Sequence, residues 1–189
     1  MTAEDIKVEL YYYYLYKRQF LLVTTEQQLD LGYIMDVWVM DKNYMGIEIE
    51  IKVSRSDLMG ELNTINRIQL SKVHPTLYPE YQGGCKYRKH KLYLSGTYKT
   101  ATALPNRFYF AVPEELKELA LKGIKNTPYG LLVVQKSEYR GAMNTTVVKS
   151  AKLIHKGVVG QKIINQTMRR LAGENYDYKL NRLLTNKQK

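Results

Sequence analysis

Two neighbouring segments, 33–40 and 45–53, are rich in Ile, Val, Met and Trp, with polar residues at alternating positions. Such alternation is typical of β-strands, because successive side chains of a strand point to opposite faces of the sheet. The polar stretch 41–44 between them predicts a tight turn. We therefore expect an antiparallel hairpin that turns around Lys42 and Asn43.

Four charged residues lie on the two strands of this predicted hairpin. Glu48, Glu50 and Lys52 are spaced two apart, so they should share one face of the sheet. Asp36, on the preceding strand, should lie almost opposite Glu50. A charge that faces a core costs several kcal/mol unless it is paired or binds a metal, so the cluster suggests that function sets these residues. The alternative is a solvent-facing strand with alternating Glu and Lys.

The rest of the chain extends this hairpin into a larger sheet. Strands are expected at 19–24, 107–112, 130–134 and, as a short edge, 145–149; helices are expected at 3–18, 54–73 and 158–172, with another beginning at Pro113. The four consecutive Tyr residues at 11–14 would also suit a strand. A strand, a helix and a strand between 107 and 134 predict a parallel pair, so the sheet should be mixed and the fold class α/β.

The charged cluster on the hairpin suits metal-assisted chemistry. Carboxylate oxygens are the ligands that Mg2+ or Mn2+ prefers, and a Lys ammonium can orient a water or stabilise negative charge on a phosphate. The three histidines, His74, His90 and His155, lack metal-ligand spacing, so we expect ordinary core or surface residues. The sequence has no Gly-rich loop followed by Lys and Ser or Thr, so nucleotide hydrolysis by a P-loop is not indicated.

These residues resemble the signature of the PD-(D/E)XK, or restriction-endonuclease-like, nuclease superfamily, in which an acid on one core strand precedes acid-x-Lys on the next strand and then a helix. Here the first element is Met35-Asp36, with no Pro before the Asp, and the second is Glu50-Ile51-Lys52. The chain is most similar to MmcB-like DNA repair proteins and related phage nucleases, on the segments 53–58, 108–116 and 128–134. The resemblance covers residues 31–135 and implies a restriction-endonuclease-like mixed central sheet flanked by helices.

The resemblance also implies roles for the residues of the hairpin. Asp36 and Glu50 would coordinate one or two Mg2+ or Mn2+ ions, and the carbonyl of Ile51 would be a further ligand. Lys52 would position the attacking water or stabilise charge in the transition state.

Two further acids are candidates for the same centre. In some members of the superfamily an acid of the first helix completes the metal site, and here that residue would be Glu9, with a plain surface Glu as the alternative. Glu48 would be a supporting acid or an alternate metal ligand, or it would pair with Lys52 for structural reasons.

Composition favours nucleic acid as the partner. The chain has 29 Lys and Arg against 18 Asp and Glu, a net charge of +11, although many basic proteins bind nothing in particular. Cys85 is the single cysteine, and no signal peptide or membrane-spanning run is recognisable. We expect a cytoplasmic protein with one domain over 1–189, a basic irregular insertion at 75–106 and a basic, frayed tail at 179–189.

The densest positive run lies in that insertion and comprises Lys86, Arg88, Lys89 and Lys91. Because Tyr side chains are interleaved with it, the segment could follow a phosphate backbone while a ring stacks on an unpaired base. Two alternatives remain open. The segment could be a solvated loop, or Lys89-His90 could enter a second helix, as a Lys-His pair does in related proteins.

Ser54 and Arg55 are candidates for a different phosphate contact. They begin the predicted helix after the acid-x-Lys strand, where free backbone N–H groups could hold a phosphate. Simple helix capping by Ser54 is the alternative.

The function that the sequence favours is metal-dependent hydrolysis of phosphodiester bonds in DNA, in repair, recombination, or a phage or defence role. One alternative is a module of the same fold that binds nucleic acid or a protein and does not cut. Another is RNA as the substrate, since both nucleic acids present the same phosphates. A homodimer would suit an enzyme that cuts both strands of a duplex.

Overall fold

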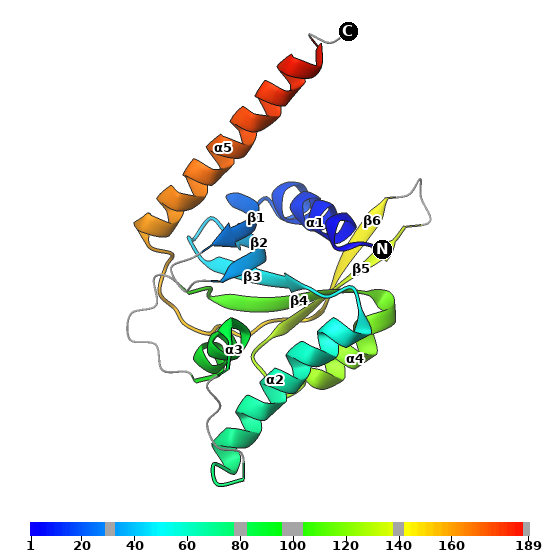
Figure 1. Ribbon diagram of the computed structural model, residues 1–189, viewed down its shortest axis with the longest axis vertical. Coiled ribbons are helices and arrows are strands. Elements are labelled where there is room, and N and C mark those ends of the chain that lie inside the picture. The colour runs from blue at the N-terminus through cyan, green and yellow to red at the C-terminus, as the bar shows by residue number, and fades with distance from the viewer. Residues whose placement is uncertain (29–32, 78–82, 96–103, 138–141, 187–189) are drawn as a thin grey trace.

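The computed structural model describes residues 1–28, 33–77, 83–95, 104–137 and 142–186 (Figure 1). Its centre is a six-stranded sheet in which the strands follow chain order. They are β1 (Leu22–Gln28), β2 (Ile34–Met40), β3 (Gly46–Ile51), β4 (Arg107–Pro113), β5 (Gly130–Lys136) and β6 (Met143–Lys149). The β3–β4 and β4–β5 pairs are parallel and the other pairs are antiparallel. The mixed α/β sheet that the sequence predicted is confirmed.

Helices cover both faces of this sheet (Figure 1). They are α1 (Ala3–Tyr12), continued by a π-helical turn at Tyr13–Lys17, α2 (Arg55–Val73), α3 (Cys85–Ser95), α4 (Lys117–Gly123), preceded by a 3-10 turn at Glu114–Leu116, and α5 (Gln161–Asn186). α1 packs on one face, whereas α2, α3 and α4 pack on the other. α5 begins beside β1 and β2 and projects away from the sheet.

The alternation along β3 decides which side chains reach which face. Ile47, Ile49 and Ile51 pack in the core beneath α1. Glu48 and Glu50 consequently point to the opposite face, where α2 and α3 lie. On that face the neighbouring strand β4 contributes aromatic rings to the core. The carboxylates of β3 are therefore enclosed between a sheet and helices instead of facing solvent.

The first strand differs from its prediction, because the sequence indicated 19–24 and the structure places β1 at Leu22–Gln28. Gln19 has a positive φ of 51° and the backbone N–H of Phe20 donates to the carbonyl of Tyr14. These two residues therefore close the end of the first helix. The capping box that holds the other end, between Thr2 and Asp5, agrees with the predicted helix start.

The segment 75–106, predicted to be irregular, contains the eleven-residue helix α3. Residues 78–82 and 96–103 lie outside the described residues. α3 buries Tyr87, His90 and Tyr93, which are three residues apart and so lie on one helix face. The lysines and arginines interleaved with these residues obscured this spacing, and the alternative of a helix at Lys89-His90 is the correct one.

The prediction of a frayed tail from residue 179 is also wrong for residues 179–186, which the structure describes as helical. The closing helix was predicted over 158–172, but α5 runs from Gln161 to Asn186. Gly173 interrupts the predicted pattern without ending the helix. Although α5 is long, it is polar, and within the described ranges no helix is long and apolar enough to cross a membrane.

Candidate functional site

The predicted hairpin forms with the expected register. Val37 pairs with Ile49 and Trp38 with Glu48, so the same register, continued by one residue, puts Asp36 opposite Glu50. The backbone ladder ends at this point, and the Oδ2 of Asp36 accepts a hydrogen bond from the backbone N–H of Ile51 at 2.7 Å. The carboxylate thus takes the place of a strand carbonyl, where β2 and β3 separate.

Glu48, Glu50 and Lys52 share one face, as the alternation predicts, and all three are buried, with 0%, 7% and 3% of their surface exposed. Lys52 Nζ donates to the Oε1 of Glu50 at 2.9 Å. Burial explains why these groups must be paired, since an isolated charge inside a protein is strongly disfavoured. The alternative of a solvent-facing strand is therefore wrong.

Lys89 of α3 is the central cation of the site. Its Nζ lies 3.1 Å from the Oε1 of Glu48 and 2.8 Å from the Oε2 of Glu50, so it bridges the two carboxylates. It also lies over the rings of Tyr33 and Phe108, 5.3 and 5.2 Å from their centroids. With 4% of its surface exposed, Lys89 is not available to a phosphate backbone, and its predicted role in nucleic-acid binding is corrected.

Glu61 of α2 is a further buried acid of the site, which the sequence did not indicate. Its Oε1 lies 2.6 Å from the Nε2 of His90, whose Nδ1 lies 2.9 Å from the hydroxyl of Tyr129. The Oε2 of Glu61 lies 3.4 Å from the Nζ of Lys52 and 2.9 Å from that of Lys86, as ion pairs without the geometry of a directed hydrogen bond. His90 is a buried partner of an acid, in agreement with its predicted role as a core residue.

The outer edge of the site is formed by Asp57 and Lys86. Asp57 lies 3.3 Å from the Nζ of Lys52 and 3.6 Å from that of Lys86. About half of each of these two side chains is exposed. The network therefore extends from a closed interior to solvent at the start of α2 and α3.

Two Tyr hydroxyls close the inner end around Glu48. Tyr93 donates to the Oε2 of Glu48 at 2.5 Å, and the hydroxyl of Tyr33 lies 3.3 Å from the same oxygen. Tyr33 and Tyr93 also bond to each other through their hydroxyls. Because Lys89 occupies the other oxygen, both oxygens of Glu48 are engaged. Glu48 pairs with Lys89, and not with Lys52 as one alternative had it.

The pKa values follow this arrangement. Burial raises the pKa of Asp36, and the nearby charge of Glu50 raises it further. Burial also raises the pKa of Glu48 and outweighs the opposing charge of Lys89. For Glu50, burial acts in the same direction, but the charges of Lys89 and Lys52 are stronger together and lower its pKa. The two acids that face each other across the hairpin therefore have pKa values displaced in opposite directions.

The two buried lysines stay charged. Burial would lower the pKa of Lys52, yet the charges of Glu50 and Glu61 raise it well above its usual range. Burial likewise opposes the charge of Lys89, and Glu48 and Glu50 raise its pKa. Burial lowers the pKa of His90, although its hydrogen bond with Glu61 opposes this effect. Lys52 is thus a hydrogen-bond donor at neutral pH and not a proton acceptor.

Asp36 and Glu50 offer the oxygen donors that a divalent cation needs. Counted as ionised, the described site holds five carboxylates against three ammonium groups. The Oδ1 of Asp36 accepts no hydrogen bond from a described residue, and the repulsion from Glu50 is the kind that a cation relieves. The oxygens of Glu50 are shared with Lys52 and Lys89, and among the described residues no three acids, His or Cys converge as in a formed metal cage. The donors fit a hard cation if the cation replaces one of the two lysines that contact Glu50.

Glu9 lies elsewhere in the fold. It is buried on α1, on the face of the sheet opposite to α2 and α3, where its Oε1 accepts from the hydroxyl of Thr145 at 3.0 Å. Its nearest described cation is Lys17, at 4.0 Å. Burial raises the pKa of Glu9. The structure therefore does not bring Glu9 to Glu50, and it is not the surface residue of the alternative either.

Ser54 caps α2, as the alternative for this residue held, because its hydroxyl accepts from the backbone N–H of Asp57 at 3.3 Å. Arg55 follows it and is exposed. In the basic run of α3, Arg88 and Lys91 are exposed, whereas Lys86 pairs with acids of α2. Exposure leaves Ser54, Arg55, Arg88 and Lys91 available for a phosphate contact, which stays a prediction.

One sequence signal could have identified Glu61. The apolar stripe of α2 contains Leu58, Leu62 and Ile65, and Glu61 lies on the same stripe at helical spacing from Leu58. A charged residue on a buried stripe needs a partner, and His90 and Lys86 supply it. Nothing local in the sequence indicates which helix carries that partner.

Comparison with known proteins adds a fold and no activity. No family model and no curated protein matches the chain. Among solved structures, the SPO1766 protein of unknown function from Silicibacter pomeroyi is similar, with a TM-score of 0.50 and 15% sequence identity over 93% of this chain and 84% of that one. At that identity the likeness shows the fold alone.

Proposed function

We propose that the protein is a metal-dependent nuclease that hydrolyses phosphodiester bonds, with DNA as the favoured substrate. The observation that carries the proposal is the placement of Asp36, Glu50 and Lys52 at the end of β3. Two repelling carboxylates and a protonated lysine meet where β2 and β3 separate, beside the exposed start of α2. The sequence resemblance to the PD-(D/E)XK superfamily supports the same roles.

Asp36, Glu50 and Lys52 would have different roles in the proposed hydrolysis. Asp36 and Glu50 would hold Mg2+ or Mn2+, with the Ile51 carbonyl as a further ligand, and such an ion supplies Lewis-acid activation of a phosphate and its attacking water. The negative charges of its neighbours keep Lys52 protonated, so it would donate a hydrogen bond to that water or to the charge developing on phosphate. Glu50 would keep Lys52 aligned through the 2.9 Å contact between Oε1 and Nζ.

The net charge of +11 supports a polyanionic substrate. Ser54 and Arg55, beside Lys52 in the chain, would contact the phosphate backbone together with Arg88 and Lys91 of α3. DNA is favoured over RNA through the resemblance to DNA repair and phage nucleases. Action as a homodimer and a location in the cytoplasm belong to the same proposal.

One observation favours a second candidate function, a module that binds nucleic acid without cutting it. Lys89 and Lys52 already pair with Glu48 and Glu50, so the charges of these two carboxylates are balanced without an added cation. In that case Asp36 would serve only to accept from the Ile51 N–H. The two functions differ in whether a metal binds and whether a strand is cut.

The test is cleavage of labelled single-stranded, double-stranded and branched DNA, and of RNA, with Mg2+, Mn2+ or a chelator. Wild type is compared with Asp36→Asn and Lys52→Met, and with Glu118→Gln, which removes an exposed acid of α4 as the control. We expect metal-dependent cutting that falls by about a hundredfold or more in the two site variants and is unchanged in the control. Circular dichroism checks that each variant is folded.

A binding measurement separates the two candidates. Mn2+ bound to wild type, followed by electron paramagnetic resonance, should be lost in Asp36→Asn and retained in Glu118→Gln. Nucleic acid bound without metal and without cutting, equally in all variants, would favour the non-catalytic module and overturn the nuclease proposal.

A further inference from the structure

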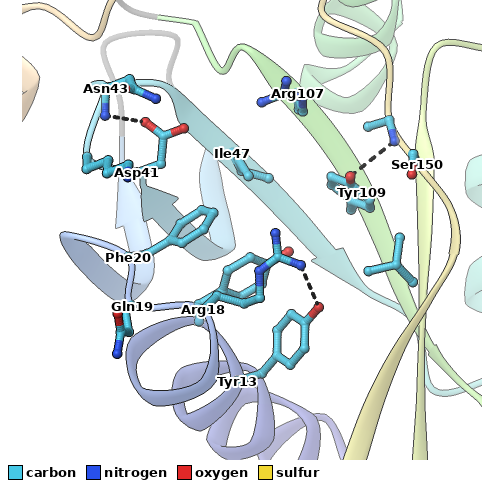
Figure 2. A pocket seen from close by; sticks show the side chains of 14 residues that line it. Tyr13, Arg18, Gln19, Phe20, Asp41, Asn43, Ile47, Arg107, Tyr109 and Ser150 are labelled. Carbon is cyan, nitrogen blue, oxygen red and sulfur yellow. Dashed lines mark hydrogen bonds between the residues drawn. The ribbon is translucent and has the colours of Figure 1, made fainter.

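A concave site lies on the face of the sheet that carries α1, away from Glu50 and Lys52. It is a pocket of about 490 Å3, within the range of about 300–1,000 Å3 that is usual for small-molecule sites. Figure 2 shows Arg18 and Tyr13, from the end of the first helix, on one side, and Arg107 and Tyr109 of β4 on the other.

The two arginines give this pocket its charge. Arg18 is exposed and donates to the hydroxyl of Tyr13 at 3.4 Å, while Arg107 is half-buried as the first residue of β4. Among the described residues, no carboxylate lies within ion-pair distance of either guanidinium. Lys42 adds a third cation at the rim. A half-buried guanidinium without an acid is a costly arrangement unless a ligand supplies the anion.

The acid that lines the pocket does not neutralise these groups. The Oδ1 of Asp41 accepts from the backbone N–H of Asn43 at 2.8 Å and from that of Met45 at 3.0 Å, so it holds the β2–β3 turn (Figure 2). The lining therefore combines three cations with one acid that is engaged by the backbone. The pocket is built for an anion.

Its backbone is unusual on two sides. The π-helical turn Tyr13–Lys17 leads into Gln19, which has a φ of 51°, and Tyr44, which ends the β2–β3 turn, has a φ of 58°. Non-glycine residues with positive φ cost free energy and cluster at ligand sites, as π-helical turns do. These features place Arg18 and the turn residues around the cavity.

Aromatic rings complete the lining. Phe20 is half-buried, and its ring packs edge-on against that of Tyr14, with centroids 5.0 Å apart. Tyr109, on the opposite wall, accepts from the backbone N–H of Ala151 at 3.1 Å (Figure 2). A flat base can stack on such rings, and guanidinium groups match a phosphate through paired hydrogen bonds.

We propose that this pocket binds a nucleoside monophosphate, either as a free nucleotide or as the terminal nucleotide of a nucleic acid strand. A terminal phosphate carries a charge of about −1.5 to −2 at neutral pH, which matches Arg18 and Arg107. The proposal goes beyond the nuclease function and does not depend on it, because the pocket and the acidic cluster lie on opposite faces of the sheet.

The test is isothermal titration of AMP, dAMP and adenosine with chelator present, so that neither metal nor cutting contributes. We expect saturable binding of AMP or dAMP, and we expect adenosine to bind at least about tenfold more weakly than AMP. The double variant Arg18→Gln with Arg107→Gln should lose about tenfold or more in affinity. A charge-matched control, Lys125→Gln with Arg169→Gln, changes two exposed residues outside the pocket and should bind as wild type.

A second arm identifies the source of the nucleotide. A single-stranded oligonucleotide with a 5′-phosphate, one with a 3′-phosphate and one with neither compete against AMP. Stronger competition by either phosphorylated strand marks a strand end as the ligand, whereas competition by none of them marks the free nucleotide. Lys42→Gln, in an exposed turn, repeats the test should the double variant fail to fold. No saturable binding of AMP, dAMP or the phosphorylated strands, or equal affinity in the arginine variants and the control, would overturn the proposal.

Discussion

Replacing Lys89 by Met should destabilise the fold strongly, because it removes a buried charge and keeps the length of the side chain. Lys89 contacts Glu48 at 3.1 Å and Glu50 at 2.8 Å. At an effective dielectric constant of about 20, each such attraction is roughly 5–6 kcal/mol before desolvation is considered. Desolvation cancels much of that, but the variant leaves two carboxylates buried without their shared cation. Breaking a buried pair in this way costs about 3–5 kcal/mol.

The assay is urea denaturation followed by circular dichroism at pH 7. Lys91→Met is the matched control, since Lys91 is exposed on the same helix and its loss should cost no more than about 1 kcal/mol. A double-mutant cycle with Glu48→Gln measures the coupling between Lys89 and Glu48 directly. We expect Lys89→Met in the Glu48→Gln background to cost less than in wild type, because the remaining carboxylate, Glu50, keeps its pair with Lys52.

The pH dependence gives an independent check. In wild type the pKa of Glu50 is lowered, so the stability it contributes is present above its unfolded pKa and is lost as the pH falls through the folded value. Without Lys89, Glu48 loses its facing ammonium and Glu50 keeps only that of Lys52, so both pKa values rise relative to wild type and protonation in acid stabilises the variant. The destabilisation should therefore shrink between pH 7 and about pH 5. A loss below about 1 kcal/mol that does not change with pH would refute the reasoning.

Two further substitutions test the scaffold by the same urea assay. Asn106→Ala should lower the free energy of unfolding by about 2–4 kcal/mol, because the buried amide accepts from the Gly46 N–H at 2.7 Å and donates to the carbonyl of Gly157 at 2.6 Å. Asn63→Ala, which changes an exposed residue, should alter the free energy of unfolding by no more than about 0.5 kcal/mol. A similarly small loss for Asn106→Ala would mean that water replaces the amide. Gly46→Ala should cost about 1–3 kcal/mol or more, because an added Cβ would overlap the ring of Trp38. Gly60→Ala on α2, where a Cβ meets nothing, should instead be neutral or stabilising, and equal effects at the two glycines would contradict the argument.

The hairpin and the mixed sheet could be predicted because they depend on local patterns. The period of two along β2 and β3 determines both the faces and the register, so the sequence alone predicts that Asp36 lies opposite Glu50. The apolar strands β4 and β5 are buried on both faces and read as continuous hydrophobic runs. These signals need no knowledge of the rest of the chain.

The partners of the acids could not be predicted in the same way. The sequence places Lys89 in a basic run that is typical of a solvent-exposed, nucleic-acid-binding surface. Only the packing of α3 against β3 shows that its side chain points into the protein. Glu61 and His90 are nearly thirty residues apart in the chain, and their contact depends on α2 lying beside α3. Long-range pairing of charges is set by tertiary packing, which a period within one helix does not encode.

The two ends of the network differ in a way that assigns their roles. At the inner end both oxygens of Glu48 are taken by Lys89, Tyr33 and Tyr93, so Glu48 has no oxygen left for a metal, and we infer that it anchors α3. On the other side of Glu50, next to the last residue of β3, Asp36 keeps one oxygen without a described partner. Glu50 stands between the two ends and contacts a lysine from each. Metal binding at the proposed site would therefore require only a local exchange at Glu50, and the inner pairs would hold the fold while it occurs.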